Sequence, residues 1–317
     1  MRKKLNILIL LYLLGSTILF SCSSAIENQI VVAADGSGDY KSIQEAINAV
    51  RSSEETTLIF IKSGIYKEKL VVPVDKENIH FVGEDAAKTI ITWDDYSGKG
   101  DINTFTSFTM QILGNNICVE NLTIENSEGM QGQAVALHVE GDGCSFKKCR
   151  ILGNQDTVYA SGKNSRQYFQ ECYIEGTTDF IFGSSTAVFQ DCVILCKKNS
   201  YITAASTPKE SEFGYVFMNC KIEAAPEISK VYLGRPWRDY ANVVFLNCEL
   251  GAHIRPEGWH NWSKPEREET AFYAEYQNRG LGADTSDRVV WSKQLTAKQA
   301  EKYTVENVLQ LSKWEIK

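Results

Sequence analysis

A five-residue pattern that recurs six times along the chain constrains its fold more than any other feature. It reads x-[acidic or Asn]-[Cys or Leu]-x-[Ile or Leu], and its third position falls at Leu122, Cys149, Cys172, Cys192, Cys220 and Cys248. The steps between copies are 27, 23, 20, 28 and 28 residues. An irregular period of about 20–30 residues with short strands is typical of a β-solenoid, whose coils bury their apolar faces by stacking on one another. The sequence therefore predicts an all-β solenoid.

Both ends of the predicted solenoid carry helical signals, as an open stack of coils requires. Ser42-Ile43-Gln44-Glu45 has the sequence of a capping box, and apolar residues follow it at helical spacing. Near the other end we predict a second amphipathic helix over Thr296–Leu309, after a strand over Arg288–Trp291. No linker rich in Pro, Gly or Ser divides the chain. We therefore predict one domain over about residues 28–317, with short capping helices at both ends.

The cysteines of the repeat share one position, which predicts an inward-facing ladder of small apolar side chains. Eight cysteines follow Cys22, and an even count in an exported protein also suggests disulfides. Adjacent coils would bring the Cα atoms of Cys149 and Cys172 within bridging range, so this pair is the best disulfide candidate. We expect packed thiols to be the main role of the ladder.

The N-terminus has the features of a targeting segment. Arg2, Lys3 and Lys4 are followed by an apolar run over Ile7–Leu14 that is too short to span a bilayer comfortably. We therefore predict a signal peptide over residues 1–21. Leu19-Phe20-Ser21-Cys22 resembles a bacterial lipoprotein signal, in which the cysteine, here Cys22, becomes the lipidated first residue; ordinary cleavage is the alternative. The protein is expected to be exported from a bacterial cytoplasm, as an outer-membrane, periplasmic or cell-surface lipoprotein, or otherwise as a secreted protein.

Two aspartates occupy the same phase of the repeat. Asp156 lies seven residues after Cys149, and Asp179 lies seven residues after Cys172. Equivalent positions in stacked coils lie one strand spacing apart, about 4.8 Å. Two carboxyl groups that close titrate together, and one pKa rises. A neutral acid beside a charged carboxylate suits acid–nucleophile chemistry, although a single aspartate here could instead cap a turn.

Other polar side chains cluster near these acids in the sequence. Gln133, on a predicted strand before the first aspartate coil, and Gln155 could donate N–H groups to a developing oxyanion. In Leu233-Gly234-Arg235-Pro236-Trp237, the indole could stack on a sugar ring while the guanidinium pairs with a carboxylate. The alternatives are a polar ladder residue for Gln133, and an aromatic wedge with a surface ion pair for Arg235 and Trp237.

Several classes of function lack their sequence signals. No Gly-x-Ser-x-Gly elbow is present, which disfavours a serine hydrolase. The histidines have no metal-ligand spacing, and no glycine-rich loop resembles a phosphate cradle; they are His80, His138, His253 and His260. The net charge of −7 and the lack of a basic run disfavour nucleic acid as a partner. We therefore expect no metal and no cofactor.

Over nearly all of its length after the targeting segment, the chain resembles the pectin methylesterases. The resemblance rests on five motifs in the family's order: Gly64-Ile65-Tyr66-Lys67-Glu68, Gly132-Gln133-Ala134-Val135-Ala136-Leu137, Gln155-Asp156-Thr157-Val158-Tyr159, Asp179-Phe180-Ile181-Phe182-Gly183 and Leu233-Gly234-Arg235-Pro236-Trp237. It implies a right-handed parallel β-helix. It also implies hydrolysis of the methyl esters of pectin, without a metal, to methanol and polygalacturonate through an aspartyl acyl-enzyme.

The motifs assign roles to individual residues. By this resemblance Asp179 is the nucleophile, and Asp156 is the general acid and then the general base. The remaining matches are Gln133 and Gln155 as oxyanion donors, Arg235 as the residue that orients the nucleophile and also contacts substrate, and Trp237 and Thr104 as sugar contacts. We also predict that Phe180 contacts substrate. Val158 departs from the commoner leucine, a change of core size only.

Three other functions fit parts of the same pattern. A glycosidase or lyase would also use paired carboxylates, but an amide pair beside the acids suits an acyl oxyanion, which a glycosidase does not form. A carbohydrate-binding or adhesive solenoid would use the aromatic and amide side chains but not the in-phase aspartates. An esterase acting on another uronate ester is compatible with every motif.

Overall fold

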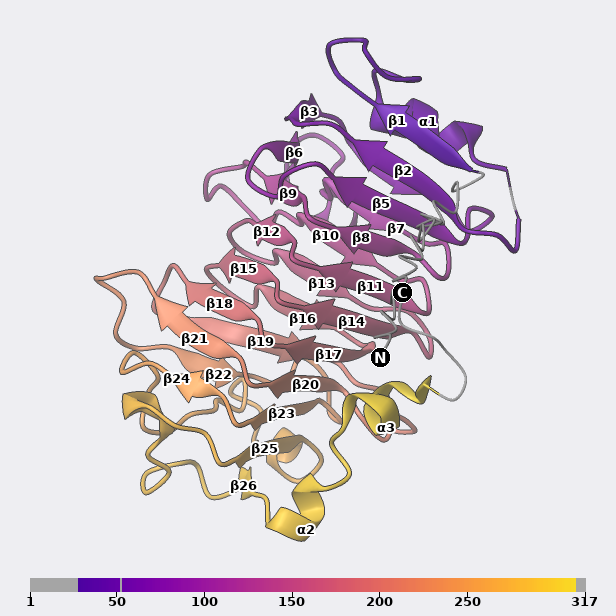
Figure 1. Ribbon diagram of the computed structural model, residues 1–317. Coiled ribbons are helices and arrows are strands. Elements are labelled where there is room, and N and C mark those ends of the chain that lie inside the picture. The colour runs from indigo at the N-terminus through magenta and orange to yellow at the C-terminus, as the bar shows by residue number, and fades with distance from the viewer. Residues whose placement is uncertain (1–27, 52, 312–317) are drawn as a thin grey trace, which may run out of the picture.

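The computed structural model describes residues 28–51 and 53–311 (Figure 1). The predicted signal peptide, Cys22 and the last residues of the predicted domain lie outside this part of the chain. The described residues wind into a parallel β-helix with three sheets of 11, 8 and 7 strands, and the central coils contribute one strand to each sheet. Its turns are right-handed, as the crossovers between parallel strands almost always are. The predicted solenoid is therefore confirmed.

The strands of the three sheets are short and all pair in parallel. The 11-stranded sheet holds β1 (Gln29–Val32), β2 (Thr57–Ile61), β5 (Ile79–Gly83), β8 (Cys118–Glu120), β11 (Cys144–Lys147), β14 (Arg166–Gln170), β17 (Thr186–Gln190), β20 (Tyr215–Met218), β23 (Asn242–Leu246), β25 (Phe272–Tyr276) and β26 (Lys293–Gln294). The 8-stranded sheet holds β3 (Gly64–Lys67), β6 (Thr89–Trp93), β9 (Thr123–Asn126), β12 (Arg150–Leu152), β15 (Tyr173–Gly176), β18 (Val193–Cys196), β21 (Lys221–Ala224) and β24 (Glu249–Leu250). The 7-stranded sheet holds β4 (Leu70–Val72), β7 (Met110–Ile112), β10 (Leu137–Val139), β13 (Val158–Ala160), β16 (Ile181–Gly183), β19 (Tyr201–Ala205) and β22 (Tyr232–Gly234).

The repeat marks the corner between the 11-stranded and the 8-stranded sheets. Its second position has a positive φ of 51–57° in every copy; these residues are Asn121, Lys148, Glu171, Asp191, Asn219 and Asn247. A left-handed residue turns the chain sharply, and Asn and Asp tolerate this conformation best among residues with a side chain. The left-handed corner therefore accounts for the Asn and Asp at four of these six positions, while Lys148 and Glu171 show that it does not require them.

The third position of the repeat then points into the core. From Cys149 onward these cysteines are at most 1% exposed, which confirms the predicted ladder. Beside it, a column of stacked phenylalanines has ring centroids 4.3–4.7 Å apart; it comprises Phe146, Phe169, Phe189, Phe217 and Phe245. Side chains of the same type at the same position of each coil thus form a continuous apolar interior.

All the cysteines among the described residues are buried free thiols, so the structure contains no Cys149–Cys172 disulfide. The physical reason is the direction of the side chains. Cys149 Sγ lies 3.3 Å from the carbonyl oxygen of Val119, and Cys172 Sγ lies 3.4 Å from that of Phe146, so each thiol donates to a backbone carbonyl. Burial raises the pKa of the Cys144 thiol to about 12. A thiol in such surroundings stays neutral and unreactive.

The N-terminal end of the core is covered by α1 (Ile43–Ala49), as predicted. The Ser42 hydroxyl accepts a hydrogen bond from the Glu45 backbone N–H at 3.3 Å. Glu68 adds a second cap from outside the helix. Its carboxylate accepts from the Ser42 hydroxyl at 2.6 Å and from the backbone N–H groups of Ile43 and Gln44 at 2.9 and 3.0 Å. A carboxylate at this helix end satisfies donors that have no partner within the helix.

The C-terminal cap differs from the prediction. The prediction of a single helix over Thr296–Leu309 is wrong, because the chain forms two short helices there, α2 (Ala297–Ala300) and α3 (Val305–Leu309). Thr304 caps the start of α3 by accepting from Asn307 N at 3.2 Å, which breaks the helix there. No helix among the described residues is long and apolar enough to cross a membrane.

The predicted strand over Arg288–Trp291 is also wrong. These residues form turns, and only Lys293–Gln294 pair as β26. The Arg288 guanidinium is buried on Glu275, with 2.8 Å between Arg288 Nε and Glu275 Oε1. This buried ion pair holds the segment against the end of the coil.

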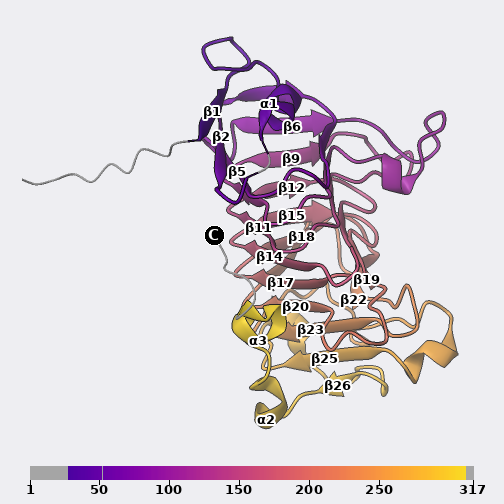
Figure 2. The same ribbon diagram turned by 90° about the vertical axis from the view of Figure 1, so that its right-hand side faces the viewer.

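The two longest connections that leave the 8-stranded sheet lead to β7 of the 7-stranded sheet and directly to β25 of the 11-stranded sheet. The segment between β6 and β7 includes η1 (Thr104–Thr106), and the segment between β24 and β25 includes η2 (Pro265–Glu268). Figure 2 shows both segments projecting from the same side of the coil, the first in purple and the second in orange. A third short helix, η3 (Leu281–Ala283), follows β25. The two projecting segments border the site described next.

Candidate active site

The two in-phase aspartates lie side by side at the corner that leads into the 7-stranded sheet. Asp156 precedes β13 and Asp179 precedes β16, with φ values of 66° and 51°. The Asp156 N–H donates to Thr178 O at 3.1 Å, which places the two aspartates in register on neighbouring coils. Each is 5% exposed. The predicted pairing of Asp156 and Asp179 in space is therefore confirmed.

Arg235 forms a bidentate ion pair with one of the two acids only. Its Nε donates to Asp179 Oδ1 at 2.9 Å, and its Nη2 donates to Asp179 Oδ2 at 2.6 Å. Arg235 directly follows β22, whose last residue, Gly234, packs against Thr203 of β19 with no room for a Cβ atom. The close contact between β19 and β22 fixes the position of the Arg235 backbone.

The surroundings of the two carboxyl groups separate their protonation states. Burial, and then the nearby charge of Asp179, raises the pKa of Asp156 well above its ordinary value, against weaker opposing effects of Gln133 and Arg235. Burial also raises the pKa of Asp179, but the hydrogen bonds and the charge of Arg235 oppose this rise. These effects favour a proton on Asp156 over a proton on Asp179.

The acids open into a small cavity of about 190 Å³ that brings the predicted polar residues together. The lining consists of Thr104, Phe105, Gln133, Gln155, Asp156, Asp179, Phe182, Ala204, Arg235, Trp237 and Trp262. Gln155 adjoins Asp156 in the same turn. Gln133 lies in an extended segment before β10, not on a strand as predicted, because its carbonyl accepts from Ser97 N of the β6–β7 connection at 2.8 Å.

The predicted substrate contact at Phe180 is wrong. Its side chain is 0% exposed and belongs to the core. Phe180 sits at the bend after Asp179 and packs over Gly176, where a residue with a Cβ atom would collide with it. Phe182, which lies in β16 two residues after Phe180, lines the cavity instead.

The structure adds aromatic residues that the motifs did not assign. Phe105 lies 5.1 Å from Tyr159 and 6.5 Å from Trp237, measured between ring centroids. Phe182 lies 5.9 Å from Trp237, and Trp262 closes the cavity beside Arg235. An aromatic residue in the polar stretch from Asn261 to Lys264 was the available sequence signal for Trp262. Aromatic walls around paired acids suit a sugar ring, whose C–H faces stack on such side chains.

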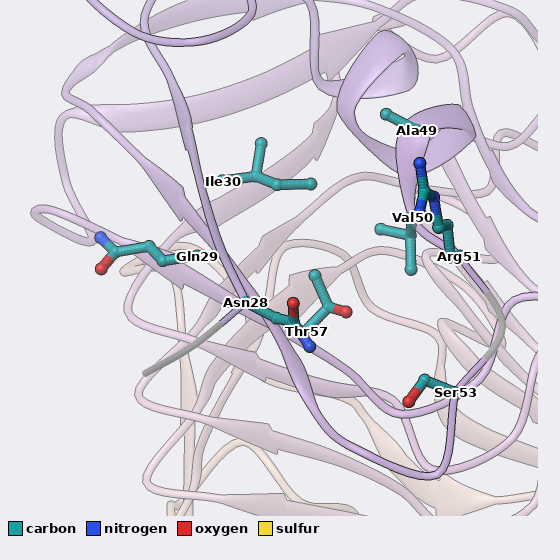
Figure 3. Close-up of a pocket in the computed structure, with 8 residues that line it drawn as sticks. All are labelled: Asn28, Gln29, Ile30, Ala49, Val50, Arg51, Ser53 and Thr57. Atoms are coloured by element: carbon teal, nitrogen blue, oxygen red, sulfur yellow. The ribbon is translucent and has the colours of Figure 1, made fainter. Parts of the chain in front are cut away.

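A larger recess of about 510 Å³ lies at the N-terminal end of the coil, away from the acids (Figure 3). It is lined by Asn28, Gln29, Ile30, Ala49, Val50, Arg51, Ser53 and Thr57. These residues include neither an acid nor a histidine. Within the described parts of the chain, no group of three or more His, Cys, Asp or Glu side chains is arranged to hold a metal ion.

Comparisons with known proteins agree on one family. The Pectinesterase family model matches residues 29–312. The chain is 38% identical to probable pectinesterase/pectinesterase inhibitor 64 of Arabidopsis thaliana over 92% of its own length, and it spans 52% of that relative. It is 40% identical to pectinesterase 31 of the same plant, over 87% of its own length and 90% of the relative.

A solved structure has the same fold over nearly the whole chain. The pectin methylesterase from carrot superposes with a TM-score of 0.87 at 36% identity, over 92% of this chain and 96% of that one. The match therefore includes the coils that carry both aspartates. The chain belongs to the pectinesterase family.

Proposed function

We propose that the protein hydrolyses the methyl esters of galacturonate units in pectin and releases methanol and de-esterified polygalacturonate. One observation carries this proposal: two buried, in-phase aspartates of which only Asp179 is paired with an arginine. The arrangement supplies one carboxylate to attack an ester and one protonated carboxyl group to donate a proton to the leaving group. We further propose that residues 28–317 form one catalytic domain.

In the first half of the reaction, an oxygen of the Asp179 carboxylate attacks the ester carbonyl carbon. The carbonyl oxygen becomes negative, and the side-chain N–H groups of Gln133 and Gln155 donate hydrogen bonds to it. The bond between the carbonyl carbon and the methoxy oxygen then breaks. The proton on Asp156 moves to the methoxy oxygen, so that methanol leaves and an anhydride between Asp179 and the galacturonate remains.

In the second half, Asp156 is ionised and acts as the general base. It takes a proton from water, whose oxygen attacks the galacturonyl carbon of the anhydride. The anhydride bond breaks, the galacturonate carboxyl group is released, and Asp179 returns to its pair with Arg235. Asp156 is protonated again and ready for the next ester. Arg235 also contacts the substrate, and Trp237 and Thr104 contact the sugar rings on either side.

The test is methanol release from highly methylated homogalacturonan, measured together with the length of the polysaccharide. We expect methanol at a rate proportional to enzyme concentration, with no shortening of the chain. Shortening without methanol would make the protein a glycosidase or lyase. Neither product, with the polysaccharide still bound, would make it a binding protein.

The sugar contact at Trp237 can be separated from a structural role. Trp237 is half-buried in the cavity wall, with the Arg238 guanidinium 4.8 Å from its ring centroid. Trp237→Ala should weaken substrate binding by about 1–3 kcal/mol, seen as a higher KM, with little change in Tm. Trp259→Phe is the matched contrast, because Trp259 is fully buried and donates to Glu275 at 3.3 Å. It should lower Tm and leave KM unchanged. A lower Tm with an unchanged KM for Trp237→Ala would show that Trp237 is a core residue.

We also propose that the protein works outside the cytoplasm. The basic residues at positions 2–4, the short apolar run and Cys22 support a signal peptide over residues 1–21 with a lipid anchor on Cys22. The anchor would hold the catalytic domain at a membrane surface, where polymeric pectin outside the cell is accessible.

The anchor gives a simple fractionation result. Expressed in a bacterial host with its own leader, the protein should sediment with membranes, because a diacylated cysteine binds a bilayer stably. Cys22→Ser should appear in the soluble fraction with unchanged methanol release. Equal solubility of the two proteins would leave an ordinary cleaved signal peptide as the better account.

A further inference from the structure

The Arg235 guanidinium is held between two aromatic rings. Its central carbon lies 3.9 Å from the ring centroid of Tyr201 and 3.7 Å from that of Trp262. The rings cover its two faces, and its edge is left for Asp179. Such a sandwich is stabilised by cation–π attraction and by stacking of the planar guanidinium. We call Tyr201, Arg235 and Trp262 the arginine clamp.

Trp262, which supplies one ring of the clamp, has an unfavourable backbone conformation. Trp262 has a φ of 61° and Ser263 a φ of 53°, so two consecutive residues with side chains are left-handed. Bulky residues rarely adopt this conformation, and it persists only where other contacts enforce it. Two side chains provide these contacts: His260 Nδ1 accepts from Trp262 N at 2.9 Å, and Asn261 Oδ1 accepts from Ser263 N at 2.9 Å.

His260 also contacts the other ring of the clamp, that of Tyr201. Its ring lies 5.4 Å from the Tyr201 ring and 5.3 Å from the Tyr232 ring, tilted or edge-on to both. Tyr201 and Tyr232 stack on each other at 5.3 Å across β19 and β22. The His260 imidazole thus contacts the ring of Tyr201 and accepts a hydrogen bond from the backbone of Trp262, the two residues whose rings cover Arg235.

We propose that His260 is a positioning residue for the esterase reaction. With Nδ1 unprotonated, it holds the Trp262 backbone in the conformation that lays the indole on Arg235, and so keeps the guanidinium in line with Asp179. This inference rests on the proposed function. His260 itself does not touch the reacting atoms.

The charges around His260 favour the form that the hydrogen bond requires. Burial, and then the positive charges of Arg235 and Arg255, lowers the pKa of His260 below its ordinary value. Arg255 lies 4.8 Å above the Tyr232 ring and is itself paired with Glu257 at 3.1 Å. The imidazole is therefore neutral at neutral pH. As the pH falls through this lowered pKa, Nδ1 gains a proton, stops accepting from Trp262, and places a second cation beside Arg235.

The test uses three variants. His260→Ala removes the acceptor. In His260→Asn, the amide oxygen can occupy the place of Nδ1 and accept from Trp262 N–H without titrating. His80→Asn is the control, because His80 lies on β5 of the 11-stranded sheet, within 3.5 Å of Glu120. Two quantities are measured between pH 4 and 8: the kcat and KM of methanol release, and the chemical shift of the Trp262 backbone amide by ¹⁵N NMR.

We expect His260→Ala to lower kcat by roughly 10- to 100-fold, since small misplacements of catalytic groups cost that much, with a smaller change in KM. His260→Asn should restore most of kcat. The Trp262 amide should titrate below about pH 6.5 in the wild type and in His80→Asn, but not in His260→Asn. A Trp262 amide that does not titrate in the wild type, or an unchanged kcat for a folded His260→Ala, would overturn the inference. A wild type without methanol release would refute the proposed function, while the amide titration would still decide whether His260 holds Trp262.

Discussion

Asp179→Asn is expected to lower kcat for methanol release by at least about 10⁴-fold, the scale on which loss of a nucleophile acts. An amide has nearly the shape of the carboxylate but does not form the anhydride. The variant also removes the negative charge opposite Arg235, whose guanidinium stays between Tyr201 and Trp262. KM should change much less than kcat, because the cavity keeps its shape. Stopped assays of methanol with purified protein measure the effect.

Asp142→Asn is a matched control for this experiment. Asp142 is also an arginine-paired carboxylate, with 2.7 Å between its Oδ2 and Arg166 Nη2, but it lies away from the cavity. Both variants should lose some stability in thermal melts, since each removes the negative charge that is paired with an arginine. Only Asp179→Asn should lose activity. A folded Asp179→Asn that keeps methanol release within tenfold of the wild type would show that Asp179 is not the nucleophile.

Gln133→Ala should reduce kcat by roughly 10²- to 10³-fold, the usual loss when one oxyanion donor is removed. The donor acts on charge that develops in the transition state, so KM should move less than kcat. Gln133 reaches the cavity from the segment before β10, and its backbone carbonyl remains bonded to Ser97 N in the variant. Steady-state kinetics on methylated homogalacturonan separate the two constants.

Gln111→Ala provides the comparison for this loss. Gln111 lies on β7 of the same 7-stranded sheet, where its amide nitrogen is 3.2 Å from His138 Nδ1. It is not among the residues that line the cavity, so kcat should stay at the wild-type value. If Gln133→Ala changed KM alone, Gln133 would bind the ground state and another group would have to stabilise the oxyanion.

The sequence was sufficient to predict the coil and the pairing of the acids, because both follow from a repeat. Equal offsets from Cys149 and Cys172 place Asp156 and Asp179 in the same position of successive coils, regardless of the lengths of the other connections. The repeat does not predict which residue pairs with Asp179. Arg235 is 56 residues from Asp179, and only the motif resemblance linked them.

Features at bends and ends were predicted less well. Phe180 and Phe182 are two residues apart and would share a face in a continuous strand. The left-handed Asp179 and the space above Gly176 turn Phe180 inward instead. Likewise, the apolar spacing over Thr296–Leu309 fits one helix, but Thr304 starts a new one. Trp262 was missed because its position depends on a loop of irregular backbone, which periodicity does not describe.

The buried thiol ladder has a consequence for how the chain reaches its folded state. An unfolded chain in an oxidising compartment exposes its cysteines to mispairing, while the folded chain buries all those described here. Solenoids fold by adding one coil to the next. Each docking event therefore buries only the cysteines of its own coil, and the time for which a given cysteine is exposed to oxidants is set by that coil rather than by the whole protein.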